Sequence, residues 1–267
     1  MPSTNHPSIS DWLVCSETSA SDNGAHVQTI TEMCRPSNLS STLAREIEDA
    51  RFHPQLIADY AKVLGVQSAS DLVHSFLPKG TTIRRGYFGE VLAASCLRDF
   101  DHCWIPVQKL RSMITSDQSL PGIDVLGAHV ADDRFEALIF VEAKLRTVRD
   151  RRVVLDAAIE LIADFERRYP SILHFAATEL MKTQDPMYQP FLDYLKRREQ
   201  RETEDLPYVY LVQEKGLWSE DDIELLEDLV PLPNGFRISI VEIDDLGDLV
   251  EDAYSAVGIL VDDDDDE

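Results

Sequence analysis

The sequence predicts an α/β fold in which helices cover a mixed sheet. Two long segments carry apolar residues at helical spacing, and four shorter apolar segments alternate or run continuously as strands do. Their order along the chain is helix, three strands, helix, strand. The helices are expected at 83–100 and 153–169, and the strands at 103–111, 122–130, 137–146 and 208–216. This order predicts an α/β core in the middle of the chain.

The remaining segments are expected to surround this core. Short strands are expected at 11–17 and 25–33, helices at 40–52, 55–65, 69–77 and 219–230, a last strand at 236–243, and after it a final helix within the helical spacing of 241–257. The predicted organisation is an N-terminal segment of unassigned role at 1–40, a helical part at 41–82, a helical insertion in the core at about 170–200, an acidic C-terminal part at 215–261 and a disordered acidic tail at 262–267.

The net charge of −24 is concentrated near the C-terminal end. Residues 201–267 hold 22 Asp and Glu but 3 Lys and Arg. Such acidity slows association with a polyanion. Three interpretations stay open: the acidic C-terminal part docks on a basic partner surface, it covers a basic patch of this chain, or it serves solubility alone.

The composition favours a soluble cytoplasmic protein. No apolar run reaches the length of a membrane span, and the first 30 residues lack the pattern of a signal peptide. Four cysteines without CxxC spacing suit a reducing compartment. Zinc-ligand spacing, phosphate-binding Gly-rich loops and Ser-His-Asp signatures are also missing from the sequence.

The apolar segment 137–146 ends with two charged residues, Glu142 and Lys144, which project from the same face of a strand. The polar stretch 131–134 predicts a hairpin turn centred near Asp133. In that register Val125 faces Val141, Leu126 faces Phe140, Ala128 faces Leu138, and Asp124 falls opposite Glu142. Asp124, Glu142 and Lys144 are therefore expected to converge at one edge of the sheet.

Two opposed carboxylates repel each other across a ladder, and a divalent cation would compensate. Asp124, Glu142 and the main-chain carbonyl of Ala143 suit Mg²⁺, with Mn²⁺ as a possible substitute. Lys144 could orient or deprotonate an attacking water and offset charge on a phosphorane-like transition state. Glu90, on the helix before the first strand, is a further candidate ligand.

Each of these residues also fits an ordinary structural role. An acidic-x-Lys triplet is expected by chance in so acidic a chain, Asp124 fits a strand end, and Glu90 fits a solvated helix position. The joint pattern of helix, Asp-bearing strand and Glu-x-Lys strand favours a metal-dependent nuclease site.

Basic residues lie next to this pattern and predict contacts to phosphate groups. The segment 144–152 carries five basic residues and one acid. A solvated helix start explains part of it equally well, and the arginines near Glu90 could pair with acidic surface. The candidate nucleic-acid-binding residues are Arg84, Arg85, Arg146, Arg149, Arg151 and Arg152.

The motifs "GYFGE", "PGIDVLG" and "LIFVEAKLR" resemble the PD-(D/E)xK nuclease superfamily. This resemblance implies a restriction-endonuclease-like core of order α-β-β-β-α-β over about residues 83–214, although Pro121-Gly122-Ile123-Asp124 departs from a literal Pro-Asp pair. Within it, "RRGYFGEVLAASCL", "IPVQKLR" and "FVEAKLRT" look most like the HamA family, nuclease subunits of the Hachiman antiphage defence system.

The HamA resemblance implies a metal-dependent DNA nuclease that works with a superfamily 2 helicase, HamB. It assigns the catalytic role to Glu90, Asp124, Glu142 and Lys144. Two alternatives remain. The chain could be a stand-alone nuclease of restriction or junction type, or a catalytically inactive nuclease fold that serves as a binding subunit.

Overall fold

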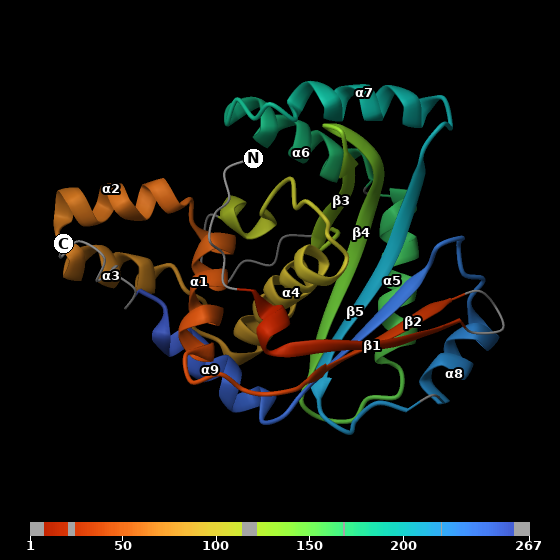
Figure 1. Cartoon of the computed structure of the whole chain (residues 1–267), viewed down its shortest axis with the longest axis horizontal. Coiled ribbons are helices and arrows are strands. Elements are labelled where there is room, and N and C mark those ends of the chain that lie inside the picture. Colours follow the sequence, from red (N-terminus) through yellow and green to blue (C-terminus); the bar gives the residue numbers. More distant parts are fainter. Residues whose placement is uncertain (1–7, 21–24, 114–121, 168, 220, 259–267) are drawn as a thin grey trace.

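The computed structural model describes residues 8–20, 25–113, 122–167, 169–219 and 221–258. Over these residues the chain forms one six-stranded sheet of order β1-β2-β6-β5-β4-β3 (Figure 1). The strands are β1 (Leu13–Ala20), β2 (His26–Glu32), β3 (Val125–Ala131), β4 (Arg134–Arg146), β5 (Glu204–Glu214) and β6 (Arg237–Ile243). The predicted tail at 262–267 lies outside the described residues.

The sheet is mixed, as predicted. Strands β2, β6, β5 and β4 are parallel neighbours, and β1 and β3 pair antiparallel to them at the two edges of the described sheet. The strands predicted near 11–17, 25–33, 208–216 and 236–243 are confirmed. Strand β6, which comes from the acidic C-terminal part, therefore lies in the interior of the sheet.

The strand predicted at 103–111 is wrong. Within this segment Trp104 alone makes a bridge, to Ala128 of β3, with N–O distances of 2.9 and 2.8 Å. Pro106 follows two residues later and has no N–H to donate, so a ladder cannot continue through it. The chain instead closes into a 3₁₀ helix, η2 (Lys109–Ser112).

The predicted register of the β3–β4 hairpin is confirmed. Val125 pairs with Val141, Leu126 with Phe140 and Ala128 with Leu138. A register shift after His129 moves the turn to Asp132 and Asp133, which have φ of 49° and 57°. Two left-handed residues make the tight hairpin turn whose twist matches the strands.

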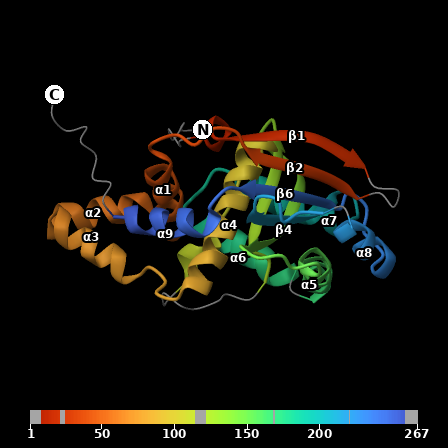
Figure 2. The same ribbon diagram turned by 90° about the horizontal axis from the view of Figure 1, so that it is seen from below.

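Helices cover both faces of the sheet. Their bounds are α1 (Leu39–Arg51), α2 (Pro54–Leu64), α3 (Val66–Ser75), α4 (Thr81–Phe100), α5 (Val153–Arg167), α6 (Tyr169–Lys182), α7 (Tyr188–Glu199), α8 (Asp221–Leu229) and α9 (Leu246–Ala256), and they match the predicted segments. Figure 1 and Figure 2 place α1, α2, α3 and α9 together at one end of the molecule and α8 at the other.

The two apolar cores follow the alternation of strand residues. Ile139 and Val141 of β4 pack into a core with α1, α4 and α9, whereas Leu138 and Phe140 pack into a core with α5 to α8. Because Glu142 continues the series of Leu138 and Phe140, it faces the α5 side.

Helix α4 lies unusually close to β4. At Gly89 an added Cβ would be 3.3 Å from Cβ of Leu145, whereas Gly86, one turn earlier in α4, has open space around it. The missing side chain of Gly89 therefore allows the close approach that brings the following residue, Glu90, to the end of β4.

Alanine at these two glycines should have opposite effects. Gly86→Ala should raise the free energy of unfolding by about 0.5–1 kcal/mol, because alanine favours a helix interior. Gly89→Ala should lower the free energy of unfolding by about 1 kcal/mol, because crowding against Leu145 outweighs the gain in helix propensity. Urea denaturation measures both, and equal stabilisation by the two variants would contradict the close packing.

Candidate functional site

Asp124 and Glu142 lie side by side at the end of the β3–β4 pair. Asp124 directly precedes the first residue of β3, and its N–H donates to the Val141 carbonyl at 3.0 Å. Its carboxylate accepts a hydrogen bond from the Ala143 N–H at 2.9 Å. The Asp124 side chain is 15% exposed and that of Glu142 is 9% exposed. The structure thus brings both predicted carboxylates and the Ala143 main chain together.

Lys144 pairs with its neighbour on the same face. Its ammonium lies 2.8 Å from Oε1 of Glu142 and also binds Oε2 of Glu160 on α5. Glu160 is a half-exposed residue that sequence reasoning missed, since nothing in the pattern of α5 marks it. The Lys144 ammonium therefore lies between the buried carboxylate of Glu142 and the half-exposed carboxylate of Glu160.

Glu90 reaches the same place from α4. Its side chain is 14% exposed, and Oε2 is buried without a hydrogen-bond partner among the described residues. Burial, followed by the charge of Asp124, raises the pKa of Glu90 well above its usual range. A buried carboxylate oxygen without a partner is costly, and such oxygens are common in sites that bind a ligand.

Lys109 is the second cation of the site, and the sequence did not predict it. Its ammonium lies 3.0 Å from Oδ1 of Asp124, 3.3 Å from the Gly122 carbonyl and 4.0 Å from Oε2 of Glu90. Its side chain is 10% exposed. Because the pattern of 103–111 predicts a strand, it provides no reason to place Lys109 in the site. The 3₁₀ helix η2 directs its side chain inward.

Burial and the neighbouring charge of Asp124 raise the pKa of Glu90 and of Glu142. Burial, followed by the charge of Asp124, raises the pKa of Glu142 to about 8, although Lys144 opposes the shift. Like charges held close together favour protonation unless positive charge compensates. Lys109 and Lys144 provide that positive charge, so each carboxylate of the site lies next to an ammonium group. We call Glu90, Lys109, Asp124, Glu142 and Lys144 the carboxylate–lysine cluster.

The cluster has the donor atoms for a divalent cation but not a ready-made metal geometry. As it stands, the described part of the chain contains no group of three His, Cys, Asp or Glu residues arranged to hold a metal ion. The donor set fits Mg²⁺, which prefers oxygen ligands. A void of about 10 Å³ borders Glu90, Lys109 and Asp124, close to the space of one water molecule. With the unpartnered oxygen of Glu90, the residues fit a small cation.

The six candidate nucleic-acid-binding arginines are engaged with other groups in this structure. Arg149 makes a two-pronged ion pair with the buried Asp222 of α8, with one contact at 2.7 Å. The other contacts are Arg84 with Glu251 at 2.7 Å, Arg85 with Oγ1 of Thr147 at 3.3 Å, Arg146 with Asp150 at 3.6 Å, Arg151 with Asp221 at 3.5 Å and Arg152 with Asp156 at 3.3 Å. Their role in DNA binding stays a prediction.

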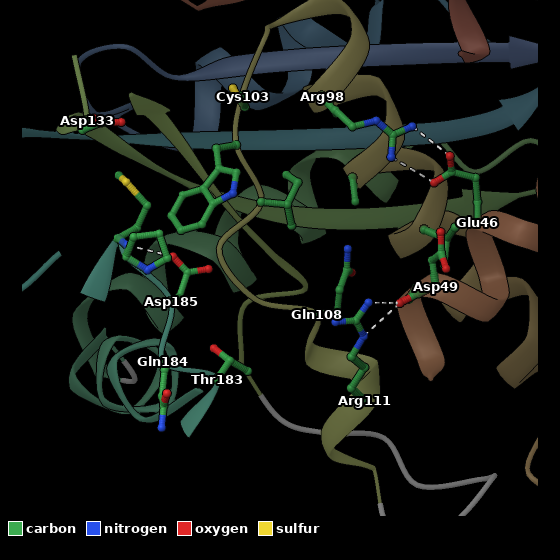
Figure 3. A pocket seen from close by; sticks show the side chains of 17 residues that line it. Glu46, Asp49, Arg98, Cys103, Gln108, Arg111, Asp133, Thr183, Gln184 and Asp185 are labelled. Atoms are coloured by element: carbon green, nitrogen blue, oxygen red, sulfur yellow. Dashed lines mark hydrogen bonds and ion pairs between the residues drawn. The ribbon is translucent and has the colours of Figure 1, made fainter. Parts of the chain in front are cut away.

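A cleft of about 830 Å³ adjoins the cluster (Figure 3). It shares Val91, Ala94 and Gln108 with the small void beside Glu90. On one side Arg98 binds Glu46 and Arg111 binds the Asp49 carbonyl, and Asp185 lies on the other. Both arginines are therefore already hydrogen-bonded within the fold, Arg98 to a carboxylate and Arg111 to a main-chain carbonyl.

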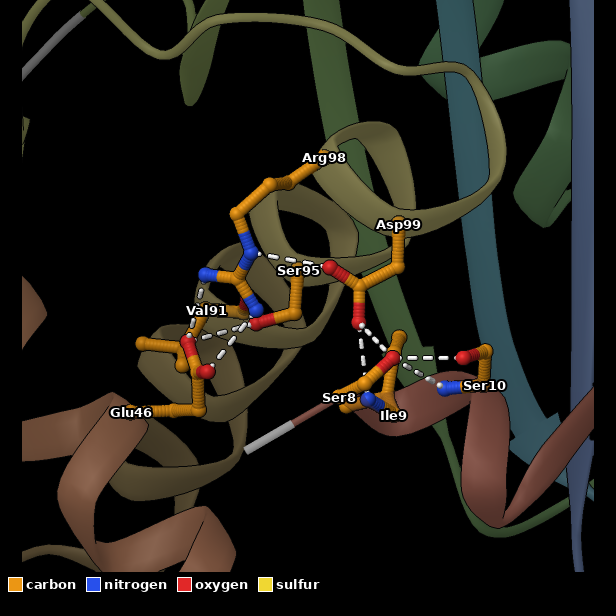
Figure 4. A network of polar contacts seen from close by, with 8 residues as sticks. All are labelled: Ser8, Ile9, Ser10, Glu46, Val91, Ser95, Arg98 and Asp99. Carbon is orange, nitrogen blue, oxygen red and sulfur yellow. Dashed lines mark hydrogen bonds and ion pairs between the residues drawn. The ribbon is translucent and has the colours of Figure 1, made fainter. Parts of the chain in front are cut away.

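Arg98 also ties the helix that carries Glu90 to the rest of the fold (Figure 4). It donates to Glu46 of α1 at 2.8 Å and to Asp99 at 2.9 Å. Asp99 in turn accepts from the Ser8 hydroxyl at 3.0 Å and the Ile9 N–H at 2.7 Å. This network fixes α1, α4 and the start of the described chain relative to one another.

Fold and site together define an α/β protein with a carboxylate–lysine cluster at the end of an antiparallel strand pair. The model of the HamA family matches residues 6–230. The chain therefore belongs to the HamA family, which associates it with antiphage defence of the Hachiman type. A comparison with curated proteins finds no match. Within the described residues, the helices are too short or too polar to cross a membrane.

Removing Arg98 should destabilise the fold. Arg98→Met leaves Glu46, whose side chain is 6% exposed, without its cation, which should lower the free energy of unfolding by about 2–3 kcal/mol. Lys182→Met is the matched control, since it breaks the exposed pair with Glu179 and should cost at most about 0.5 kcal/mol. Urea denaturation compares them, and similar small losses would argue against a structural role for the network.

Proposed function

We propose that this chain is a metal-dependent DNA nuclease that serves as the effector of an antiphage defence complex. The observation that carries the proposal is the pair Asp124 and Glu142, held side by side where β3 begins, with Lys144 bound to Glu142. Neighbouring buried carboxylates destabilise a fold. Groups of this kind are concentrated at functional sites. The restriction-endonuclease-like assignment of the core belongs to this proposal.

Mg²⁺ is the proposed cofactor, with Mn²⁺ as an alternative. Asp124 and Glu142 would hold it through carboxylate oxygens, and Glu90 would add its unpartnered oxygen. The Ala143 main-chain carbonyl is a further proposed ligand, since the N–H of the same residue binds the Asp124 carboxylate. When bound, Mg²⁺ supplies Lewis-acid polarisation of the phosphodiester and lowers the pKa of water.

Lys144 is the proposed catalytic cation. Its ammonium, fixed by Glu142 and Glu160, orients the attacking water and offsets negative charge that develops on the phosphodiester. A preorganised charge of this kind reacts without first reorganising water around it.

DNA binding requires the arginines near the cluster to exchange their present partners for phosphate groups. Arg146 and Arg152 pair with exposed neighbours on their own segment, and such pairs exchange at little cost. Arg149 differs, because its partner Asp222 is 1% exposed. We therefore assign initial phosphate contact to Arg146 and Arg152 rather than to Arg149.

A helicase partner of the HamB type is the second part of the proposal. The family supports it, and the acidic C-terminal part offers two separate acidic patches for basic partner surfaces, because α8 and α9 lie at opposite ends of the molecule. On α8, Glu224 and Asp228 are exposed one turn apart, and on α9, Asp248 and Asp252 are arranged in the same way. Clustered charge of one sign favours docking with a complementary surface.

Two alternatives predict different behaviour. A stand-alone nuclease of restriction or junction type would cut DNA without a helicase. An inactive nuclease fold that acts as a binding subunit would bind no divalent metal. The buried Oε2 of Glu90 favours an active site over an inactive one, since it has no hydrogen-bond partner among the described residues.

Cleavage of supercoiled plasmid tests the nuclease directly. The protein, alone and with its helicase, should nick or linearise plasmid with Mg²⁺ or Mn²⁺ and not with EDTA. Glu142→Gln and Lys144→Met should each lower the rate by about 100-fold or more, as expected when one group that stabilises a transition state is lost.

Glu136→Gln is the matched control, because Glu136 is an exposed glutamate on the same strand. It should cut at the wild-type rate. If Glu142→Gln cut as well as Glu136→Gln, the assignment of the site would be wrong. If the wild type were inactive with and without the helicase, the inactive-fold alternative would gain support.

Neutralising the exposed acids should weaken helicase binding. A variant with Glu224→Gln, Asp228→Asn, Asp248→Asn and Asp252→Asn should recover several-fold less co-expressed helicase in affinity purification, because complementary charge is lost. Asp193→Asn with Glu199→Gln on the exposed side of α7 is the control. Substitution is preferable to deletion of the acidic C-terminal part, because that deletion would remove β6 from the interior of the sheet. Equal recovery from all variants would contradict docking through the acidic part.

A further inference from the structure

Lys109 is surrounded by the kind of atoms that bind a metal ion. Its ammonium makes hydrogen bonds to a carboxylate oxygen of Asp124 at 3.0 Å and to the Gly122 carbonyl at 3.3 Å. Its third neighbour is Oε2 of Glu90, at 4.0 Å, too far for a hydrogen bond. Two carboxylates and a main-chain carbonyl are a ligand set that a hard divalent cation prefers.

The backbone that carries Lys109 is fixed from outside the cluster. The guanidinium of Arg51, a largely buried residue at the end of α1, donates to the carbonyls of Leu110 and Met113. Arg111 donates to the Asp49 carbonyl at 2.9 Å. With η2 held in this way, the Lys109 side chain is directed inward, yet its long flexible stem leaves the ammonium free to move.

Charge compensation explains why the Lys109 ammonium lies among these carboxylates. Glu90, Asp124 and Glu142 are largely buried, and burial of uncompensated carboxylates is strongly unfavourable. The Lys109 ammonium lies 3.0 Å from Oδ1 of Asp124 and 4.0 Å from Oε2 of Glu90, so a positive charge lies next to both carboxylates. The single charge does not satisfy the whole group, because Oε2 of Glu90 remains without a hydrogen bond among the described residues.

We propose that Lys109 is an internal counter-cation that takes the place of the divalent metal, so that metal binding requires its ammonium to leave Asp124. The inference rests on the proposed metal-dependent function and deepens it. It also makes Lys109 a positioning residue, since it acts through Asp124 and Glu90 and not on the substrate.

The test compares Mn²⁺ binding by variants at Lys109. Lys109→Met removes the charge and keeps the length of the chain, whereas Lys109→Arg keeps the charge. Lys109→Met should bind Mn²⁺ at least about tenfold more tightly than the wild type, because a positive charge next to the cation is removed. Lys109→Arg should bind like the wild type. Lys196→Met, at an exposed lysine of α7, controls for the change in net charge.

Calorimetry gives the affinity, and thermal unfolding gives a second readout. In EDTA, Lys109→Met should unfold at a lower temperature than the wild type, and Mn²⁺ should raise its unfolding temperature by more. If Lys109→Met does not fold in EDTA, Lys109→Gln, which can still donate a hydrogen bond to Asp124, should show the same tighter binding.

The outcomes separate this inference from the proposed function. If the wild type binds Mn²⁺ and a folded Lys109→Met or Lys109→Gln binds it equally or more weakly, the counter-cation role is wrong and the metal site stands. If neither the folded wild type nor the folded variants bind Mn²⁺, both the metal-dependent function and the inference fail.

Discussion

The repulsion among three largely buried carboxylates is the constraint on which the candidate site depends. Strand pairing forces Asp124 and Glu142 together, and the close packing of α4 adds Glu90. Their burial raises the pKa of Glu90 and Glu142, which means that the fold bears the cost of holding them there. Lys109 and Lys144 reduce that cost without removing it. A site in this condition favours the binding of a further cation.

The rest of the molecule holds the members of the cluster at fixed positions. Asp124 and Glu142 come from one hairpin, whose register is set by apolar pairs on both faces and by the turn at Asp132 and Asp133. Glu90 depends on the contact between Gly89 and Leu145 and on the network around Arg98. Lys109 depends on η2, which Arg51 holds to α1. Helices on one face of the sheet thus position residues that meet strand residues of the other face where β3 begins.

The sequence predicted the parts of the site that follow from local periodicity. Alternation along 122–130 and 137–146, with a polar turn between them, was sufficient to align Asp124 with Glu142, and the apolar stripe of α4 placed Glu90 on a helix before them. Lys109 was missed because Trp104, Ile105 and Val107 resemble a strand, while the ladder ends where Pro106 lacks an N–H. The pairing of Arg149 with Asp222 was also missed, because it joins segments far apart in the sequence.

Membership of the HamA family and the chemistry of the cluster support the same conclusion from independent directions. The measurement that tests it most directly is a crystal structure of the protein with Mn²⁺, in which anomalous scattering locates the metal. The account predicts a peak about 2.0–2.3 Å from carboxylate oxygens of Asp124 and Glu142, with the Lys109 ammonium displaced from Asp124. Density for Lys109 in its present position, with no anomalous peak at the cluster, would contradict it.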